Sequence, residues 1–509
     1  MVDPGSVGWW VGSNGYGGLV ILRREKSERS ELEALVERQQ EKIRVWRESP
    51  AERGGERGAE LAELVTRAAA LQAYRQVWRT VDIAAVTAAA HTDPWVALRA
   101  LPLVDKGFSR LLGDEVIALA DGRLSNYFET SGTTSAPAPA PKSTADLVVN
   151  TINFGEHWAS FLGGARFAIV LINTPQGPAA FQFEIALNYL GIGTFRTWVD
   201  ALRNDYSRVL AVIERTRPDV FAGPPSQLLN LYERAYAAGS RPPEFETVLL
   251  TGERTGPALR RRLAALTGAT VVDASYGSSE TGTTAVAVSA DELRLQTQSF
   301  LFELIVEDTA GRTVTIAAEQ RVHERGTAEG ELVVTTLDNR FRPLVRYRTG
   351  DLVRVERATG GGLALRPLGR VGDSVDIAGQ GIDQQLIENA VWGDPGLAVV
   401  NYLLAHDGDR VDLFYTSSAP VDAVESAAAE NDRVTAAIRA VLPGAVARRV
   451  PQLPASAALG SAAGWKAARV IDIGPDAALA DGAVPHLADV LRQTREFALA
   501  TRDGEVVTL

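Results

Sequence analysis

The stretch YFETSGTTSAPAPAPKS, residues 127–143, decides how this chain is interpreted. It places serine, glycine and two consecutive threonines in one loop that leads to a lysine, Lys142. Backbone N–H groups, hydroxyls and one cation in such a loop can bind a polyphosphate. The spacing between glycine and lysine excludes a P-loop of the GxxxxGK[ST] type. Because small polar loops more often only turn the chain, phosphate binding needs support from the rest of the sequence.

The composition is that of an ordinary soluble globular protein. The chain has 509 residues, of which 46% are hydrophobic and 23% are charged, so two or more domains are expected. The net charge of −11 argues against broad binding to nucleic acid or to anionic membranes. No apolar run approaches about 18 residues, so no transmembrane helix is predicted.

The sequence contains no cysteine, so structures and reactions that need a thiol are excluded. Disulfides, thiolate metal sites and a covalent cysteine intermediate are therefore excluded. The first residues, 1–18, lack the basic start and apolar core that are typical of a signal peptide. We therefore expect a cytoplasmic protein.

The periodicity of apolar residues predicts an α/β fold. Residues 27–48 and 56–79 have helical spacing and predict two amphipathic helices. Apolar strands then alternate with helices, which favours a largely parallel sheet. These strands are 167–172 and 247–250, and these helices are 207–215 and 257–267. Strands at 298–306, 331–336 and 352–356 indicate a more antiparallel region.

The pattern of elements restarts near Arg370. A Gly-rich loop there precedes predicted helices at 384–392 and 421–441 and predicted strands at 398–404 and 411–415. We therefore expect a large N-terminal domain of mixed sheets layered with helices, residues 1–370, and a small mobile C-terminal α+β domain, residues 371–509.

Four later segments carry side chains that suit a nucleotide. VVDASYGSSETG (271–282) leads a strand into a turn whose aromatic ring, hydroxyls and carboxylate could meet a base, a phosphate and Mg²⁺. In RYRTGDL (346–352), Asp351 could accept hydrogen bonds from ribose hydroxyls. GRVGDSVDIAGQGI (369–382) is typical of an interdomain hinge, and GWKAARVID (464–472) places one lysine before a strand. Each segment alone also fits an ordinary turn or a surface loop.

In this order and at these spacings, the five segments resemble the core motifs of the adenylate-forming superfamily, which includes acyl-CoA ligases, adenylation domains, luciferases and amide synthetases. The chain is most similar to the phenylacetate-CoA-ligase-like branch, and the resemblance spans roughly residues 101–472. It rests also on LPLVDK (101–106), FAGPPSQL (221–228), LLTGE (249–253) and KAARVID (466–472). The loop of residues 127–143 departs from the usual family pattern in two ways. Ser135 stands where the family usually has glycine, and the tract APAPAP (136–141) lengthens the segment that leads to Lys142.

The resemblance implies a site for ATP and Mg²⁺. The residues that would cradle the β- and γ-phosphates are Ser131, Gly132, Thr133 and Thr134. Gly252 and Glu253 would border the adenine, Tyr276 would stack on it, and Gly277 belongs to the same nucleotide-binding set. Ser279 would touch the α-phosphate, Glu280 would ligate Mg²⁺, and Asp351 would hold the ribose with help from Arg370. Lys466 would bridge the acyl carboxylate and the α-phosphate during adenylation.

The implied reaction begins with attack of a carboxylate on the α-phosphorus of ATP, which releases pyrophosphate and forms an acyl adenylate. The protein mainly positions the reacting groups and neutralises their charge, and it has little covalent chemistry to perform. In the second step the acyl group passes to an amine or to CoA. From Val371 to Leu509 the chain has 10 Lys+Arg and 19 Asp+Glu, and 10 − 19 = −9. This acidic stretch favours an amine over the phosphates of CoA, although Arg448 and Arg449 could bind CoA.

We therefore expect an amide synthetase, similar to the stand-alone enzymes of β-carboline and aminocoumarin biosynthesis. The alternatives are an acyl-CoA ligase and a non-catalytic ATP-binding relative. Because an amine arrives largely protonated, a base would help, and the candidates are Asp200 and His157. A helix cap is the alternative for Asp200, and a core or surface histidine is the alternative for His157.

The acid pocket is expected within residues 157–183 and near 222–225. Four aromatic side chains there favour an aromatic or heteroaromatic acid, although core packing is the alternative role for each of them. They are Phe154, Trp158, Phe181 and Phe183.

Overall fold

The computed structural model describes most of the chain. The described residues are 25–48, 54–120, 123–130, 137–173, 176–199, 204–308, 310–338, 341–372, 374–377, 379–408, 410–419, 424–458, 468–474 and 485–502. Among the helices in these ranges, none is both long and apolar enough to cross a bilayer.

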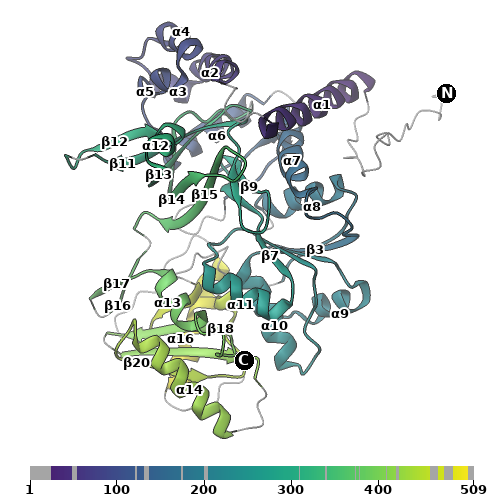
Figure 1. Cartoon of the computed structure of the whole chain (residues 1–509), viewed down its shortest axis with the longest axis vertical. Coiled ribbons are helices and arrows are strands. Elements are labelled where there is room, and N and C mark those ends of the chain that lie inside the picture. The colour runs from purple at the N-terminus through teal and green to yellow at the C-terminus, as the bar shows by residue number, and fades with distance from the viewer. Residues whose placement is uncertain are drawn as a thin grey trace, which may run out of the picture.

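A five-stranded sheet lies in the middle of the molecule (Figure 1). Its strand order is β4–β3–β5–β6–β7, and every neighbouring pair is parallel. The strands are β3 (Phe167–Leu171), β4 (Gly193–Thr197), β5 (Val220–Gly223), β6 (Thr247–Leu250) and β7 (Thr270–Asp273). The helices that connect and cover them are α7 (Thr144–Trp158), α8 (Ala179–Tyr189), α9 (Ser207–Thr216), α10 (Pro225–Ala237) and α11 (Pro257–Thr267). The predicted alternation of strands and helices is confirmed.

Alternating side chains of this sheet enter two different cores, as the period of two in a strand requires. Phe221 and Val248 face a core that includes side chains of α9, α10 and α11. Ala222 and Leu249 face a second core with aromatic side chains of α7 and α8. The central strands β3, β5 and β6 are therefore buried on both faces, which explains why they are almost continuously apolar, whereas the edge strand β4 (GTFRT) is only half-buried.

An eight-stranded antiparallel sheet lies beside the parallel one. Its order is β12–β11–β13–β14–β15–β10–β9–β8. The strands are β8 (Ser275–Ser278), β9 (Gly282–Ala287), β10 (Leu293–Leu295), β11 (Phe300–Glu307), β12 (Thr313–Ala317), β13 (Thr327–Thr336), β14 (Tyr347–Arg357) and β15 (Leu363–Arg370), with α12 (Ala318–Arg325) packed on it. One buried residue, Ala274, separates β7 of the parallel sheet from β8 of this sheet. The two sheets are thus joined directly by the chain.

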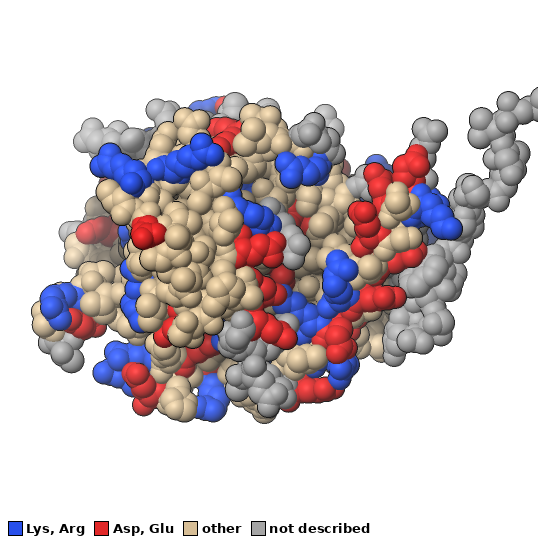
Figure 2. Space-filling view, turned by 90° about the horizontal axis from the view of Figure 1, so that it is seen from above, with Lys and Arg blue, Asp and Glu red and all other residues tan. Residues whose placement is uncertain are grey.

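Among the described residues, six helices precede α7, and they lie toward the upper end of the molecule in Figure 1. They are α1 (Lys26–Glu48), α2 (Gly54–Ala69), α3 (Gln72–Val77), α4 (Ile83–Thr92), α5 (Pro94–Arg99) and α6 (Lys106–Ala118). The face seen from above carries interspersed acidic and basic side chains (Figure 2). On α1, for example, Arg44 pairs with Glu41 and Glu48.

The single helix predicted over residues 56–79 is wrong, because the structure has two helices there, α2 and α3. The carboxylate of Glu115 on α6 accepts hydrogen bonds from the backbone N–H groups of Gln72 and Ala73. These groups begin α3, so a distant side chain caps a new helix where local periodicity alone predicts continuation.

The C-terminal part is an α+β region, as predicted, at the lower end of Figure 1. A short two-stranded sheet, β16 (Val375–Ile377) and β17 (Gln380–Ile382), precedes a four-stranded sheet of order β20–β19–β18–β21. The elements that follow β17 are α13 (Gln384–Trp392), β18 (Val399–Asp407), β19 (Arg410–Ser417), α14 (Val424–Arg439), β20 (Ala445–Arg449), the 3₁₀ helix η1 (Ala455–Ala458), β21 (Val470–Asp472) and α16 (Pro485–Arg502).

This C-terminal sheet packs against α10 and α11 through one continuous apolar core. A buried carboxylate, Glu233 of α10, lies in that contact. It accepts hydrogen bonds from the Asn401 side-chain amide at 2.9 Å and from the Leu453 backbone N–H at 2.7 Å. Burial raises the pKa of Glu233, which the bond from Leu453 opposes.

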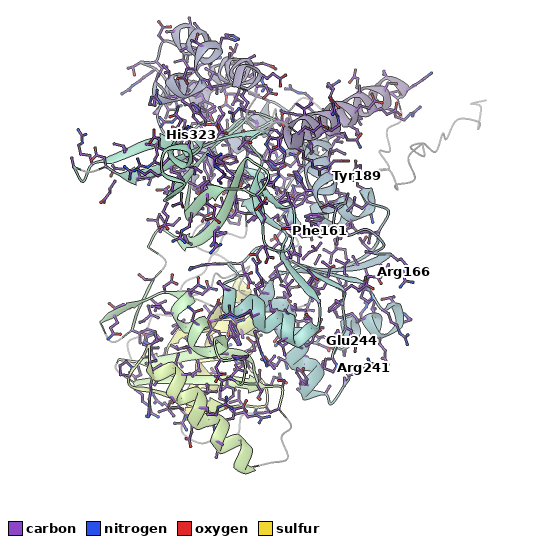
Figure 3. The ribbon with its side chains drawn as sticks, viewed as in Figure 1. Phe161, Arg166, Tyr189, Arg241, Glu244 and His323 are labelled. Carbon is purple, nitrogen blue, oxygen red and sulfur yellow. The ribbon has the colours of Figure 1, made fainter. Side chains whose placement is uncertain are left out.

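We expect Glu233→Ala to lower the free energy of unfolding by about 2 kcal/mol or more, because the substitution leaves two buried donors without an acceptor. Glu244→Ala is the matched control, since Glu244 lies beyond the end of α10 in an exposed pair with Arg241 (Figure 3). An exposed pair contributes about 0–1 kcal/mol. Thermal unfolding of both variants checks this, and equal shifts would contradict it.

Candidate active site

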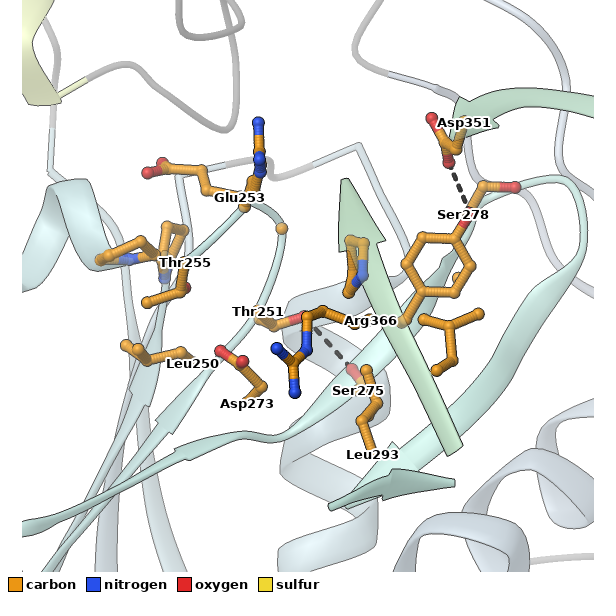
Figure 4. A pocket seen from close by; sticks show the side chains of 18 of the residues that line it. Leu250, Thr251, Glu253, Thr255, Asp273, Ser275, Ser278, Leu293, Asp351 and Arg366 are labelled. Atoms are coloured by element: carbon orange, nitrogen blue, oxygen red, sulfur yellow. Dashed lines mark hydrogen bonds between the residues drawn. The ribbon is translucent and has the colours of Figure 1, made fainter. Parts of the chain in front are cut away.

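A cavity of about 930 Å³ opens at the carboxyl ends of the parallel strands (Figure 4). The segment that follows β6 lines it, together with Asp273 at the end of β7, the β8–β9 turn, β14, β15 and α13. In open parallel sheets, ligands bind in the crevice outside the carboxyl ends of the strands. The predicted site residues that line this cavity are Gly252, Glu253, Tyr276, Gly277, Ser279, Glu280, Asp351 and Arg370.

Tyr276, Asp351 and Arg370 form one hydrogen-bonded group in the cavity wall. The Tyr276 hydroxyl donates to Asp351 Oδ2 at 2.7 Å, and Arg370 Nε donates to Asp351 Oδ1 at 2.9 Å. Asp351 and Arg370 face each other across β14 and β15, so sheet register holds the pair together. Burial, followed by the charge of Asp351, raises the pKa of Tyr276 well above its ordinary value. The phenol therefore stays protonated and its ring is fixed.

Gly252 and Glu253 form the turn after β6. Gly252 adopts a φ of 80°, a conformation that favours glycine. The Glu253 carboxylate accepts hydrogen bonds from the backbone N–H of Ser226, at 3.2 Å, and from its hydroxyl. This anchors the turn to the start of α10, so that its backbone borders the cavity.

Glu280 lies in the turn between β8 and β9, and its side chain is 5% exposed. It also lines a second cavity of about 360 Å³, which shares Tyr276, Asp351 and Arg370 with the first. No cluster of three or more acidic or histidine side chains occurs among the described residues. One carboxylate nevertheless fits Mg²⁺, which commonly binds through one or two carboxylates and the phosphates of a substrate.

Two of the four predicted aromatic residues, Phe154 and Phe183, line the cavity. Their ring centroids are 5.4 Å apart, and Trp158 lies behind them, 4.8 Å from Phe154 and 5.1 Å from Phe183. Phe181 instead packs against Phe128. Pro224 and Pro225, in the second stretch expected to form the acid pocket, also line the cavity.

Several predicted residues lie outside the described part of the chain. They are Ser131, Gly132, Thr133, Thr134, Asp200 and Lys466. Their roles therefore stay predictions.

His157 is not among the residues that line either cavity. It is 2% exposed and lies against α1, where its ring meets Trp46 edge-on at 5.4 Å and its Nδ1 lies 3.3 Å from Arg47 Nη2. The structure thus places His157 in the contact between α1 and α7.

Two residues of the cavity wall were not singled out as site residues from the sequence. Lys106 begins α6 and lines both cavities. It lies in LPLVDK, a segment that contributed only to the resemblance. Glu388 of α13 is buried beside Gln384, and burial raises its pKa to about 7. A single Glu on an amphipathic helix carries no local signal of this environment.

Comparison with known proteins places this site in a family. Residues 61–336, more than half of the chain, match the family model of AMP-binding enzymes. The chain therefore belongs to the AMP-binding enzyme family, as the order of the motifs predicted.

Among individual relatives, the phenylacetate-coenzyme A ligase of Aromatoleum evansii is 24% identical over 309 residues. That match covers 58% of this chain and 65% of the relative, so it spans just under two thirds of the relative's length. The similarity to the phenylacetate-CoA ligase branch is thus confirmed at a distant level.

Solved structures of 2-hydroxyisobutyryl-CoA ligase share the fold. The postadenylation state with R3-HIB-AMP matches with a TM-score of 0.61 and 16% identity, over 89% of this chain and 94% of that one. The thioesterification state with 2-HIB-AMP and CoA matches with a TM-score of 0.53 and 19% identity, over the same shares. The predicted combination of mixed sheets with a C-terminal α+β region is therefore confirmed.

The environment of His157 has a consequence for stability. Burial, with repulsion from Arg47 and Arg294, lowers the pKa of His157 to about 3. An unfolded histidine titrates near about 6.5, so between these values the unfolded state binds more protons and stability falls as the pH falls.

Because of His157, we expect the free energy of unfolding to fall by about 1.4 kcal/mol for each pH unit below about 6.5. His157→Gln should remove this dependence, so its unfolding midpoint should change less between about pH 7 and pH 5.5 than that of the wild type. The same pH dependence in both proteins would contradict the assignment.

Proposed function

We propose that this chain activates an aromatic or heteroaromatic carboxylic acid with ATP and then transfers the acyl group to the thiol of coenzyme A. One observation carries the proposal: a single cavity brings the aromatic wall of Phe154 and Phe183 together with Tyr276, Asp351 and Glu280. An acid on the aromatic wall and a nucleotide on the polar wall would then meet inside one site.

The polar wall suits the nucleoside part of ATP. The turn at Gly252 and Glu253 would border the adenine, and the fixed ring of Tyr276 would stack on it. Asp351 already accepts two hydrogen bonds, yet a carboxylate has about four lone-pair sites and can still accept from ribose hydroxyls. Ser131, Gly132, Thr133, Thr134 and Ser279 would bind the phosphates.

Glu280 would hold Mg²⁺ together with oxygens of the phosphates. When bound, this ion would neutralise charge on the phosphates as the carboxylate approaches. The acid oxygen would attack the α-phosphorus, the bond to the β-phosphate oxygen would break, and pyrophosphate would leave. The thiol would then attack the acyl carbon and release AMP.

We also propose that residues 1–370 and 371–509 form two domains and that Lys466 acts from the second one. Gly369 and Gly372, with φ of 131° and 76°, lie at the junction and allow backbone conformations that other residues rarely adopt. The charge of Lys466 would stabilise the negative charge that develops between the acyl carboxylate and the α-phosphate.

Two observations support CoA as the acceptor. The relative described above is a phenylacetate-coenzyme A ligase, and the solved structures described above are those of a CoA ligase. In addition, basic side chains line the large cavity, namely Arg254, Arg261, Arg354, Arg366 and Arg370. Of these, Arg254, Arg354, Arg366 and Arg370 each also pair with a carboxylate.

An amine is the second candidate acceptor, and charge favours it. Residues 371–509 carry a net charge of −9 from 10 Lys+Arg and 19 Asp+Glu. Arg448 is bonded to Asp412, and Arg449 is bonded to Glu430 and to the Ala419 carbonyl. These two arginines, considered from the sequence for CoA, already have acidic partners. Asp200 stays a proposed base for this alternative.

Product identification decides between the acceptors. We expect a panel of aromatic acids, incubated with ATP and either CoA or amines, to give acyl-CoA thioesters that mass spectrometry detects. Benzoate- and indole-type acids should release more pyrophosphate than short aliphatic acids. Amide without thioester would overturn the CoA assignment, and no pyrophosphate with any acid would overturn adenylation.

We expect Lys466→Ala to lower acid-dependent pyrophosphate release by roughly two to three orders of magnitude, as for the loss of one preorganised charge. Lys26→Ala, on the exposed start of α1, is the control and should keep the wild-type rate. An unchanged rate in Lys466→Ala would exclude the proposed role.

A further inference from the structure

Arg342 is a fully buried arginine that contacts two segments of the site. Its Nη1 donates to the Pro139 carbonyl. Its Nη2 donates to the Glu280 carbonyl at 2.7 Å and lies 3.4 Å from the Ser279 carbonyl. One guanidinium therefore connects the turn that carries Glu280 to the tract APAPAP. No motif in the sequence singles out this residue.

The tract is one side of a narrow antiparallel stem. The N–H of Thr130 donates to the Ala138 carbonyl at 3.0 Å, and the N–H of Ala140 donates to the Phe128 carbonyl at 2.7 Å. The Ala138 N–H donates to the Thr130 hydroxyl at 2.9 Å. Each of these bonds uses an alanine of the tract. Proline, which has no N–H, occupies the alternate positions, where no donor is required.

Residues 131–136, which include the residues predicted to bind phosphates, join the two sides of the stem from Thr130 to Pro137. The prolines leave carbonyls on the outer side of the stem, and Arg342 binds the carbonyl of Pro139. The contact explains the unusual tract: it forms a stiff strand whose outer edge presents an acceptor to a buried cation.

The charges around Arg342 come from both segments and from α7. Glu280 and Asp146 are the acidic groups that interact with it, and Tyr347 and Tyr74 also lie near it. Lys142, at the end of the tract, is a second buried cation. Burial, followed by repulsion from Arg342, lowers the pKa of Lys142 to about 8. The turn and the stem thus meet around two buried cations and two acidic groups.

Arg346, four residues further along, provides a contrast. It is also buried, but it pairs with Glu303 through two bonds of 2.9 Å and donates to the Leu101 carbonyl. Neither Glu303 nor Leu101 lines the two cavities of the site. The same short stretch therefore holds one arginine that supports the sheet and one that contacts the candidate active site.

We infer that Arg342 is a positioning residue that fixes the Glu280 turn against the stem of the phosphate loop. The inference rests on the proposed function, in which the loop binds ATP phosphates and Glu280 holds Mg²⁺. A guanidinium with two separate donors can hold two carbonyls at a set spacing, whereas a single-point donor cannot. Loss of this link would displace the metal ligand relative to the phosphates.

We expect Arg342→Met to lower kcat for acid-dependent pyrophosphate release by about 10²-fold, the order expected for a displacement of about 1 Å. The Mg²⁺ concentration for half-maximal rate should rise several-fold, while the KM for the acid should change less than about two-fold. Without turnover, the increase in unfolding midpoint that ATP with Mg²⁺ gives the wild type should be smaller in this variant. Arg342→Lys, which keeps the charge but has a single donor nitrogen, should recover part of the rate. It also keeps the test informative if Arg342→Met does not fold.

Arg346→Lys is the matched control. It should lower the unfolding midpoint but leave the Mg²⁺ dependence unchanged. The inference is overturned if folded Arg342 variants show the wild-type Mg²⁺ dependence, or if Arg346→Lys shifts it equally. Failure of the proposed function is a different result, because the wild-type protein would then release no pyrophosphate with any acid.

Discussion

The direct passage from β7 to β8 through Ala274 is the constraint on which the site depends. Ala274 donates its N–H to the Leu250 carbonyl of the parallel sheet, and its own carbonyl accepts from Ala287 of the antiparallel sheet. No loop separates the two sheets, so neither can move away without breaking these bonds. The residues on both sides, Asp273 and Ser275, consequently lie in the wall of one cavity. Trp158 also donates to the Ala274 carbonyl, which brings the aromatic cluster to the same point.

Much of this arrangement could be predicted from the order of the motifs. Tyr276 lies in β8, Glu280 in the turn after β8 and Asp351 in β14, and the motifs in the sequence contain all three. The environment of His157 could not be predicted in this way, because it depends on α1, more than a hundred residues earlier. The break between α2 and α3 likewise depends on Glu115, a cap supplied from another helix. Short-range patterns contain no information about such partners.

Net charge is a poor guide to the acceptor for a related reason. A sum over residues 371–509 counts every carboxylate equally, yet many are already paired with a neighbouring arginine. Arg448 with Asp412 and Arg449 with Glu430 are two such pairs. What a ligand meets is the set of side chains that faces the cavity, and this set includes arginines from β14, β15 and α11. The net charge of residues 371–509 therefore does not describe the wall of the cavity, most of which comes from earlier residues.

The alternation of alanine and proline in the tract also limits which changes of length the tract itself allows. Deleting one residue would bring a proline to a position where the stem needs an N–H, while deleting an Ala-Pro pair would restore the pattern. A single-residue insertion or deletion within the tract would therefore disrupt the stem, whereas a change of two residues would keep its hydrogen bonds.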